Sequence, residues 1–106
     1  MIKNITATEL KTKLSNNENI ELIDCREQDE WNQGYIEGAK LMPMSIFPQE
    51  MINLNDKNSE IIVQCRSGHR SMNVCQYLES QGFSNLSNLE GGIISWAQHQ
   101  FPIMQD

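Results

Sequence analysis

Short apolar runs alternate with helical stretches along the whole chain, and this alternation restricts the fold more than any other feature of the sequence. The runs that are typical of strands cover residues 2–5, 20–25, 39–42, 61–65 and 86–89. Stretches that predict helices lie at residues 8–14, 27–33, 47–54, 72–80 and 93–98. Strands that alternate with helices are joined by right-handed crossovers and form mostly parallel sheets. The sequence therefore predicts an α/β fold whose sheet carries helices on both faces.

Several expected helices carry end signals. Leu10 and Leu14 lie four residues apart, and Thr6 or Thr8 is available as the N-cap in front of them. Gly34 follows the second expected helix at the place where a residue with positive φ commonly ends one. These signals support the helix assignment.

Length and charge restrict the class of protein. A chain of 106 residues is expected to form one domain over 1–106 and to bury about two thirds of its unfolded surface. Its formal net charge of −6 argues against nucleic acid or anionic lipid as a partner, because both require a basic face. The sequence contains no cationic leader and no run of about 18 apolar residues. We therefore expect no membrane segment and a cytoplasmic location.

The cysteine and histidine content argues against structural cross-links. The three cysteines are Cys25, Cys65 and Cys75, with no Cys-x-x-Cys pair, and the two histidines are His69 and His99. An odd cysteine count without such spacing favours neither a disulfide framework nor a zinc site. We expect no metal.

The most informative chemical motif is the hexapeptide at residues 65–70, Cys-Arg-Ser-Gly-His-Arg, which contains two of the three arginines. It follows the apolar run at 61–63 and precedes a helical stretch, so Cys65 is expected at a strand-to-helix turn. There Arg66, Arg70 and the N–H groups of the helix can favour the thiolate. Gly68 suits a loop that wraps around one atom. The hexapeptide therefore predicts an anionic sulfur.

The remaining cysteines are expected to differ from Cys65. Cys75 lies on the apolar face of the following helix and is interpreted as a packing residue. Cys25 ends a strand and is interpreted as a residue that fills space, although it could resolve an oxidised Cys65 by forming a disulfide with it. His69 could act as an acid or base, but a single loop histidine is more often only exposed.

Four further residues are interpreted from their neighbours. Asp24 falls at a strand end, at the edge of the sheet where ligands gather in α/β folds. Arg26 could serve the site, but a structural ion pair with a carboxylate such as Glu90 is the preferred interpretation. Trp31 and Trp96 stand at helical positions beside apolar neighbours and are expected in the core.

Four segments together resemble a known family, the single-domain rhodaneses. Residues 65–71, Cys-Arg-Ser-Gly-His-Arg-Ser, resemble its active-site loop. Residues 22–27, Leu-Ile-Asp-Cys-Arg-Glu, resemble its Leu-Ile-Asp-Val-Arg-Glu segment. Residues 30–39 and 89–96 resemble its Glu-x-x-x-Gly-His-Ile-Pro-Gly-Ala and Leu-x-Gly-Gly-x-x-x-Trp segments. The four occur in family order and span nearly the whole chain.

The resemblance implies a five-stranded parallel sheet with flanking helices and sulfurtransferase activity without a metal or an organic cofactor. It implies that Cys65 is the sulfur-accepting nucleophile. It also implies an anion cradle made by the backbone of Arg66, Ser67, Gly68, His69 and Arg70, with the two arginine side chains binding the anionic end of the donor. Asp24 and Arg26 would support the site.

Three positions depart from the family pattern. Cys25 replaces the usual valine, Tyr35 the usual histidine and Glu37 the usual proline. None is the nucleophile or a loop arginine. The changes at Tyr35 and Glu37 weaken inference about the rim of the site, and Cys25 leaves a redox control open.

Other readings of the loop remain as alternatives. Phosphatases and arsenate reductases resemble Cys-x5-Arg, whereas Cys65 and Arg70 enclose four residues, which leaves less room for a tetrahedral oxyanion. A non-catalytic binding or regulatory module of the same fold is a further alternative, although its usual sign is loss of the loop cysteine. For the transferase, thiosulfate or another small sulfur donor is the expected substrate, and cyanide, thioredoxin, glutathione or a sulfur-carrier protein are candidate acceptors.

Overall fold

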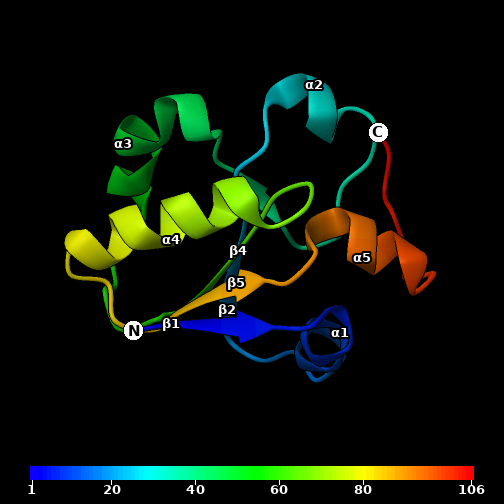
Figure 1. The fold of residues 1–106 in the computed structure, drawn as a ribbon, viewed down its shortest axis with the longest axis horizontal. Coiled ribbons are helices and arrows are strands. Elements are labelled where there is room, and N and C mark those ends of the chain that lie inside the picture. Colours follow the sequence, from blue (N-terminus) through cyan, green and yellow to red (C-terminus); the bar gives the residue numbers. More distant parts are fainter.

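All five strands of the protein run parallel in one sheet, with the order β1-β5-β4-β2-β3, in a computed structural model that describes residues 1–106 (Figure 1). The strands are β1 (Ile2–Ile5), β2 (Ile20–Asp24), β3 (Lys40–Leu41), β4 (Glu60–Gln64) and β5 (Leu86–Leu89). The helices are α1 (Ala7–Ser15), α2 (Gln28–Trp31), α3 (Phe47–Glu50), α4 (His69–Ser80) and α5 (Gly92–Gln98), with short 3-10 helices η1 (Met44–Ile46) and η2 (Met51–Asn53). The predicted α/β class and the five-stranded parallel sheet are confirmed.

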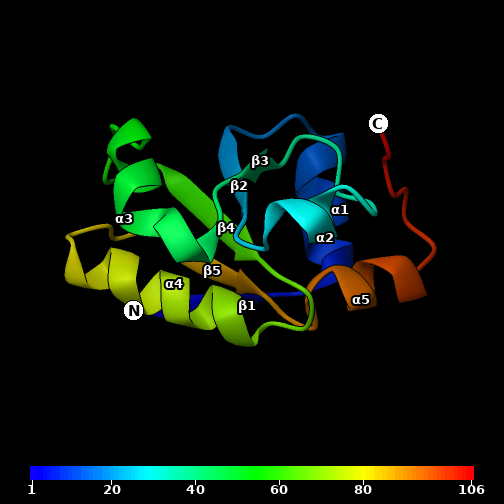
Figure 2. The ribbon, with the colours of Figure 1, turned by 90° about the horizontal axis from the view of Figure 1, so that it is seen from above.

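The sheet separates two apolar layers, because successive side chains of a strand point to opposite faces. The α3/α4 layer contains Ile23 and Val63 together with the buried side chains of α3 and α4. The α1/α5 layer contains Leu22 and Ile62 together with the buried side chains of α1 and α5. Figures 1 and 2 both show α3 and α4 on one side of the molecule and α1 and α5 on the other. Helices therefore cover both faces of β2 and β4, as predicted.

The first helix begins where its sequence signals place it. The Thr6 hydroxyl accepts a hydrogen bond from the Glu9 N–H at 3.1 Å, and the Glu9 carboxylate accepts one from the Thr6 N–H at 2.9 Å. This reciprocal capping box satisfies two donors that a helix start leaves free. Thr6, rather than Thr8, is the N-cap.

Most expected elements are present, with differences at their ends. The strands at 2–5 and 86–89 have the predicted bounds, whereas β3 is only two residues long. The stretch at 47–54 is not one helix: α3 ends at Glu50, and the 3-10 helix η2 follows it. The helix expected at 72–80 begins earlier, at His69, which brings its first turn next to Cys65.

The two tryptophans have different environments. Trp96 is buried in the α1/α5 layer, as expected. Trp31 is only half-buried, so its assignment to the core was wrong. Its ring instead stacks on Tyr35 at a centroid separation of 4.0 Å, near the edge of α2.

None of the helices is long and apolar enough to cross a membrane.

Candidate active site

Cys65 lies at the carboxyl end of β4, in the turn that leads into α4, where the sequence predicted it. It is 1% exposed. Gly68 precedes α4 with a φ of 108°, a left-handed conformation that favours glycine. This turn folds the chain back so that the first N–H groups of α4 face the end of the strand.

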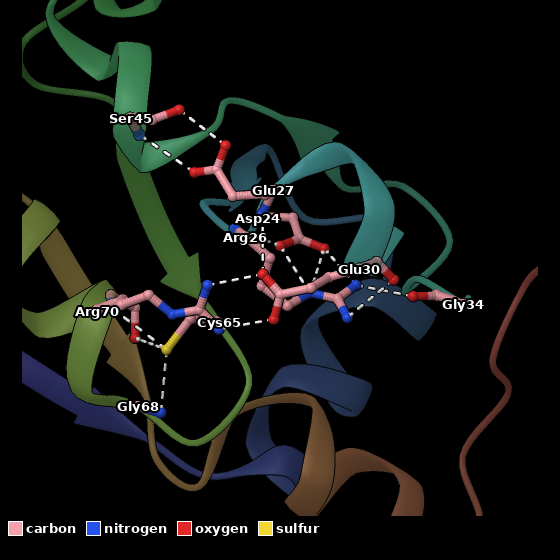
Figure 3. Close-up of polar contacts among 10 residues, drawn as sticks. Asp24, Arg26, Glu27, Glu30, Gly34, Ser45, Cys65, Gly68 and Arg70 are labelled. Atoms are coloured by element: carbon pink, nitrogen blue, oxygen red, sulfur yellow. Dashed lines mark hydrogen bonds and ion pairs between the residues drawn. The ribbon is translucent and has the colours of Figure 1, made fainter. Parts of the chain in front are cut away.

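Two backbone N–H groups converge on the sulfur of Cys65. The Gly68 N–H donates to Sγ at 3.1 Å and the Ser71 N–H donates to it at 3.4 Å. The Ser71 hydroxyl lies 3.3 Å from the same atom. Figure 3 shows the sulfur enclosed by the turn between Cys65 and Arg70. Of the residues expected in the backbone cradle, Gly68 directs its N–H at the sulfur, and Ser71, which was not selected, directs a second one; anion binding by the loop stays a prediction.

These contacts favour the thiolate. The pKa of Cys65 is lowered to about 4, first by a hydrogen bond from the Cys25 thiol and then by those from Ser71 and Gly68, against the opposing effect of burial. A free cysteine titrates near about 8.5, so Cys65 is ionised at neutral pH. The anionic sulfur thus depends on neighbouring thiol and N–H donors, and not chiefly on the arginines.

Arg70 points toward α2 (Figure 3). Its guanidinium donates to both carboxylate oxygens of Glu30, at 2.7 and 2.8 Å. This bidentate pair lowers the pKa of Glu30 to about 2 and raises that of Arg70. Arg70 therefore ties α4 to α2, and most of its charge is compensated within the chain. Glu30, which the sequence interpretation did not select, is its partner.

The other loop side chains face outward. Arg66, Ser67 and His69 are exposed. Arg66 lines a cavity of about 480 Å³ between α2 and α5, whose wall also includes Ile94 and Ile103. Arg66 takes part in none of the ion pairs of the structure, so its charge is available at the mouth of this cavity.

Asp24 and Arg26 form a buried ion pair beside the site (Figure 3). The guanidinium donates to Asp24 at 2.8 to 3.2 Å and to the carbonyl of Gly34 at 2.7 Å. A structural ion pair was predicted for Arg26, but the proposed partner, Glu90, was wrong. Asp24 lies two residues away in the same strand end and reaches the guanidinium without crossing the sheet. The pair joins β2 to the segment after α2.

The start of α5 is hydrogen-bonded to the backbone of the Cys65 loop. The Ile93 N–H donates to the Cys65 carbonyl at 2.9 Å, and the Ile94 N–H donates to the Arg66 carbonyl at 3.1 Å. At Gly92, where φ is 58°, a Cβ would lie 2.4 Å from the Arg66 carbonyl oxygen. A glycine is therefore required at position 92, because the backbone of α5 approaches the Arg66 carbonyl too closely for a side chain. The adjacent pair Gly91-Gly92 was the sequence signal for this contact, but the sequence interpretation assigned it no role.

Ser71 and Asn88 form a polar network behind the cradle that was also missed. The Asn88 amide donates to the Gly68 carbonyl at 3.1 Å, which leaves its Oδ1 to accept a hydrogen bond from the Ser71 hydroxyl. Asn88 is 5% exposed and comes from β5. The only signal in the sequence was the polar pair Ser87-Asn88 between the two leucines of this strand.

Cys25 and Cys75 are both buried in the α3/α4 layer with Cys65. Packing was predicted for Cys75 and is confirmed; burial raises its pKa to about 12. The pKa of Cys25 is also raised, first by its hydrogen bond to Cys65 and then by burial. Disulfide formation between Cys25 and Cys65 remains a prediction.

No three His, Cys, Asp or Glu side chains are grouped so that they could hold a metal ion.

Comparison with known proteins places this site in one family. The rhodanese-like domain model matches residues 6–99. The chain is 45% identical over 95 residues to the putative sulfurtransferase YtwF of Bacillus subtilis, covering 90% of each protein. It is 38% identical over 104 residues to a sulfurtransferase of Allochromatium vinosum, covering 98% of this chain and 96% of that one. A rhodanese-like domain protein from Staphylococcus aureus superposes with a TM-score of 0.81 at 39% identity, covering 89% of this chain and 90% of that one.

Proposed function

Because the chain belongs to the rhodanese-like domain family, we propose that it is a sulfurtransferase that carries a sulfane sulfur as a persulfide on Cys65. One observation carries the proposal: an ionised thiol at the carboxyl end of a strand, enclosed by N–H donors. The relatives named as sulfurtransferases match it over at least 90% of this chain. Thiosulfate is the proposed donor.

In the first half-reaction, the Cys65 thiolate attacks the outer sulfur of thiosulfate. A new sulfur–sulfur bond forms, the bond within thiosulfate breaks, and sulfite leaves with the electron pair. The product is a Cys65 persulfide that carries the negative charge on its outer sulfur. Arg66, exposed and unpaired at the mouth of the cavity, is the group that we propose to bind the anionic end of the donor.

The loop offers donors for that outer sulfur. The N–H groups of Arg66, Ser67, His69 and Arg70 make no hydrogen bond to another part of the backbone. N–H groups gathered in a turn and at a helix start bind anions and stabilise developing negative charge. A persulfide anion that extends from Cys65 into the loop would therefore find hydrogen-bond donors there.

In the second half-reaction, an acceptor attacks the outer sulfur, and Cys65 leaves as a thiolate. Cyanide would yield thiocyanate, and a thiol would become a persulfide. Two displacements through a covalent intermediate produce ping-pong kinetics. Thioredoxin, glutathione and a sulfur-carrier protein are the proposed classes of thiol acceptor. One relative, YrkF of Bacillus subtilis, is described as a putative sulfur carrier protein.

Intact-protein mass spectrometry tests the proposal. After incubation with thiosulfate, we expect the wild-type protein to gain the mass of one sulfur atom, which cyanide removes. Cys65→Ser is expected to gain none, whereas Cys75→Ser, which changes another buried thiol of the same layer, is expected to behave as the wild type. An unchanged wild-type mass would contradict the proposal. Rapid Cys65-dependent hydrolysis of an aryl phosphate would favour phosphatase chemistry instead.

A further inference from the structure

Cys25 and Cys65 are neighbours across the two central strands. The register of β2 and β4 pairs Asp24 with Gln64, and each cysteine follows immediately. The Cys25 N–H donates to the Gln64 carbonyl at 3.0 Å, so the pairing continues past the strand ends. Both cysteine side chains belong to the α3/α4 layer. Their sulfur atoms therefore lie on one face of the sheet at matching positions.

Cys75 shares this layer but directs its thiol elsewhere. Its Sγ lies 3.6 Å from the Ser87 carbonyl oxygen, to which the thiol donates. The Cys25 thiol has no such partner, and it lies in register beside Cys65 in the same buried layer. Two buried thiols thus share the layer of Cys65, and of these only the Cys25 thiol donates to no other group.

The charged groups around these sulfurs do not replace this donor. Asp24 is negative and adjacent to Cys25, and Glu79 is negative on the side of Cys75. Arg70 is the cation that acts on both Cys25 and Cys65, and Glu30 neutralises it with a bidentate pair. Hydrogen-bond donors, rather than a free cation, therefore have to compensate the buried charge on Cys65.

We propose that Cys25 is a positioning residue for sulfur transfer, which donates its thiol hydrogen to Cys65 Sγ and stabilises Cys65 as the departing thiolate in the second half-reaction. The inference rests on the proposed function. In the persulfide the charge lies on the outer sulfur; when an acceptor removes that sulfur, the electron pair of the broken bond returns to Cys65 Sγ. Cys25, the register neighbour of Cys65 in the same buried layer, lies beside the atom that receives this charge.

This role affects the two half-reactions in opposite directions. A thiolate of lower pKa leaves faster but attacks more slowly, by about threefold for each unit of pKa. Removal of the donor should therefore accelerate the uptake of sulfur from thiosulfate and slow its release to an acceptor. Loss of packing or general disorder of the loop would slow both steps.

The first experiment measures the ionisation of Cys65 without any sulfur donor. The ultraviolet absorbance of the thiolate is titrated in the wild type, in Cys25→Val and in Cys25→Ser, with Cys75→Val as the matched control. In Cys25→Val we expect the midpoint to move upward by about one pH unit or more, because a hydrogen bond to a charged group is lost. Cys25→Ser retains an O–H donor and should largely restore the midpoint. Cys75→Val should leave it nearly unchanged.

The second experiment separates the half-reactions by stopped-flow at neutral pH. For Cys25→Val we expect sulfur uptake from thiosulfate to be about threefold faster and release to cyanide to be about threefold slower, with Cys25→Ser close to the wild type. An unchanged titration midpoint in Cys25→Val would overturn the proposal, as would slowing of both half-reactions. If the wild type takes up no sulfur at all, the proposed function fails, while the titration still decides whether Cys25 stabilises the thiolate.

Discussion

The ends of β2 and β4 carry the same dipeptide, Cys-Arg, in register, yet use it in opposite ways. After β2, the arginine is buried and its cysteine keeps its proton. After β4, the arginine is exposed and its cysteine is ionised. The residue before each dipeptide accounts for the arginines. Asp24 supplies a charged partner that draws Arg26 inward, whereas Gln64 has no charge and its buried amide makes no hydrogen bond.

The difference shows how the same dipeptide can stabilise the fold at one strand end and supply an ionised thiol and a free arginine at the next. The end of β2 is closed by its own ion pair and by the Gly34 carbonyl. The end of β4 is held by the N–H groups of α5, which leave the arginine side chain free. Each of the following experiments changes the interactions at one of these two strand ends.

The largest effect is expected from Asp24→Asn at the β2 end. The change leaves the buried Arg26 charge without its partner, which costs about 3–5 kcal/mol of folding stability. We expect a correspondingly lower free energy of unfolding in urea. Lys40→Ala, which removes an ion pair that is largely exposed to solvent, provides the control and should cost at most about 1 kcal/mol. Equal stability of the two variants would contradict a structural role for the β2 pair.

Gly92→Ala tests how the β4 end is held. The added Cβ would collide with the Arg66 carbonyl, so the loop must shift and sulfur uptake from thiosulfate should fall by about tenfold or more. Gly38→Ala is the matched control, because Gly38 also has a positive φ but no atom lies within 4 Å of its added Cβ. Comparable losses of uptake in both variants would mean that backbone strain alone, and not the loop contact, is responsible.

Arg66→Ala tests the exposed arginine. Without this charge we expect the KM for thiosulfate to rise about three- to tenfold while the protein remains as stable as the wild type. Arg66→Lys should recover part of the loss because it keeps the charge. If KM for thiosulfate is unchanged in Arg66→Ala, the donor is bound by other groups.

The smallest effect concerns pH. Because the pKa of Cys65 is lowered to about 4, the thiolate is present above that value and is lost as the pH falls through it. The rate of sulfur uptake should therefore be constant near neutral pH and fall to about half at pH near 4. The favourable contribution of the thiolate to folding is full above the pKa of an unfolded cysteine, about 8.5, and is lost progressively as the pH falls from there through about 4. Circular dichroism at each pH distinguishes titration from unfolding, and a midpoint near the ordinary cysteine value would contradict the proposed environment.

Much of the molecule could be predicted from local patterns. The strands at 2–5 and 86–89, the Thr6 cap and the turn after Cys65 all depend on neighbouring residues, whose types set periodicity and backbone freedom. The partner of Arg26 was predicted wrongly, because several carboxylates were available and sequence distance does not rank them. Trp31 was misplaced since an aromatic residue on a short helix can stack at an edge as well as enter a core.

The sequence by itself determined the fold class and the strand-to-helix turn that encloses Cys65, because alternating strands and helices and a Cys-to-Arg loop are local patterns. Only the tertiary structure decided which groups from other elements surround that cysteine and its loop. Cys25, Asn88 and Glu30 reach the site from β2, β5 and α2, and nothing in their local sequence specifies a partner in another element. Parallel pairing of β2, β4 and β5 brings these distant positions together, since the sheet aligns the carboxyl ends of its strands at one edge.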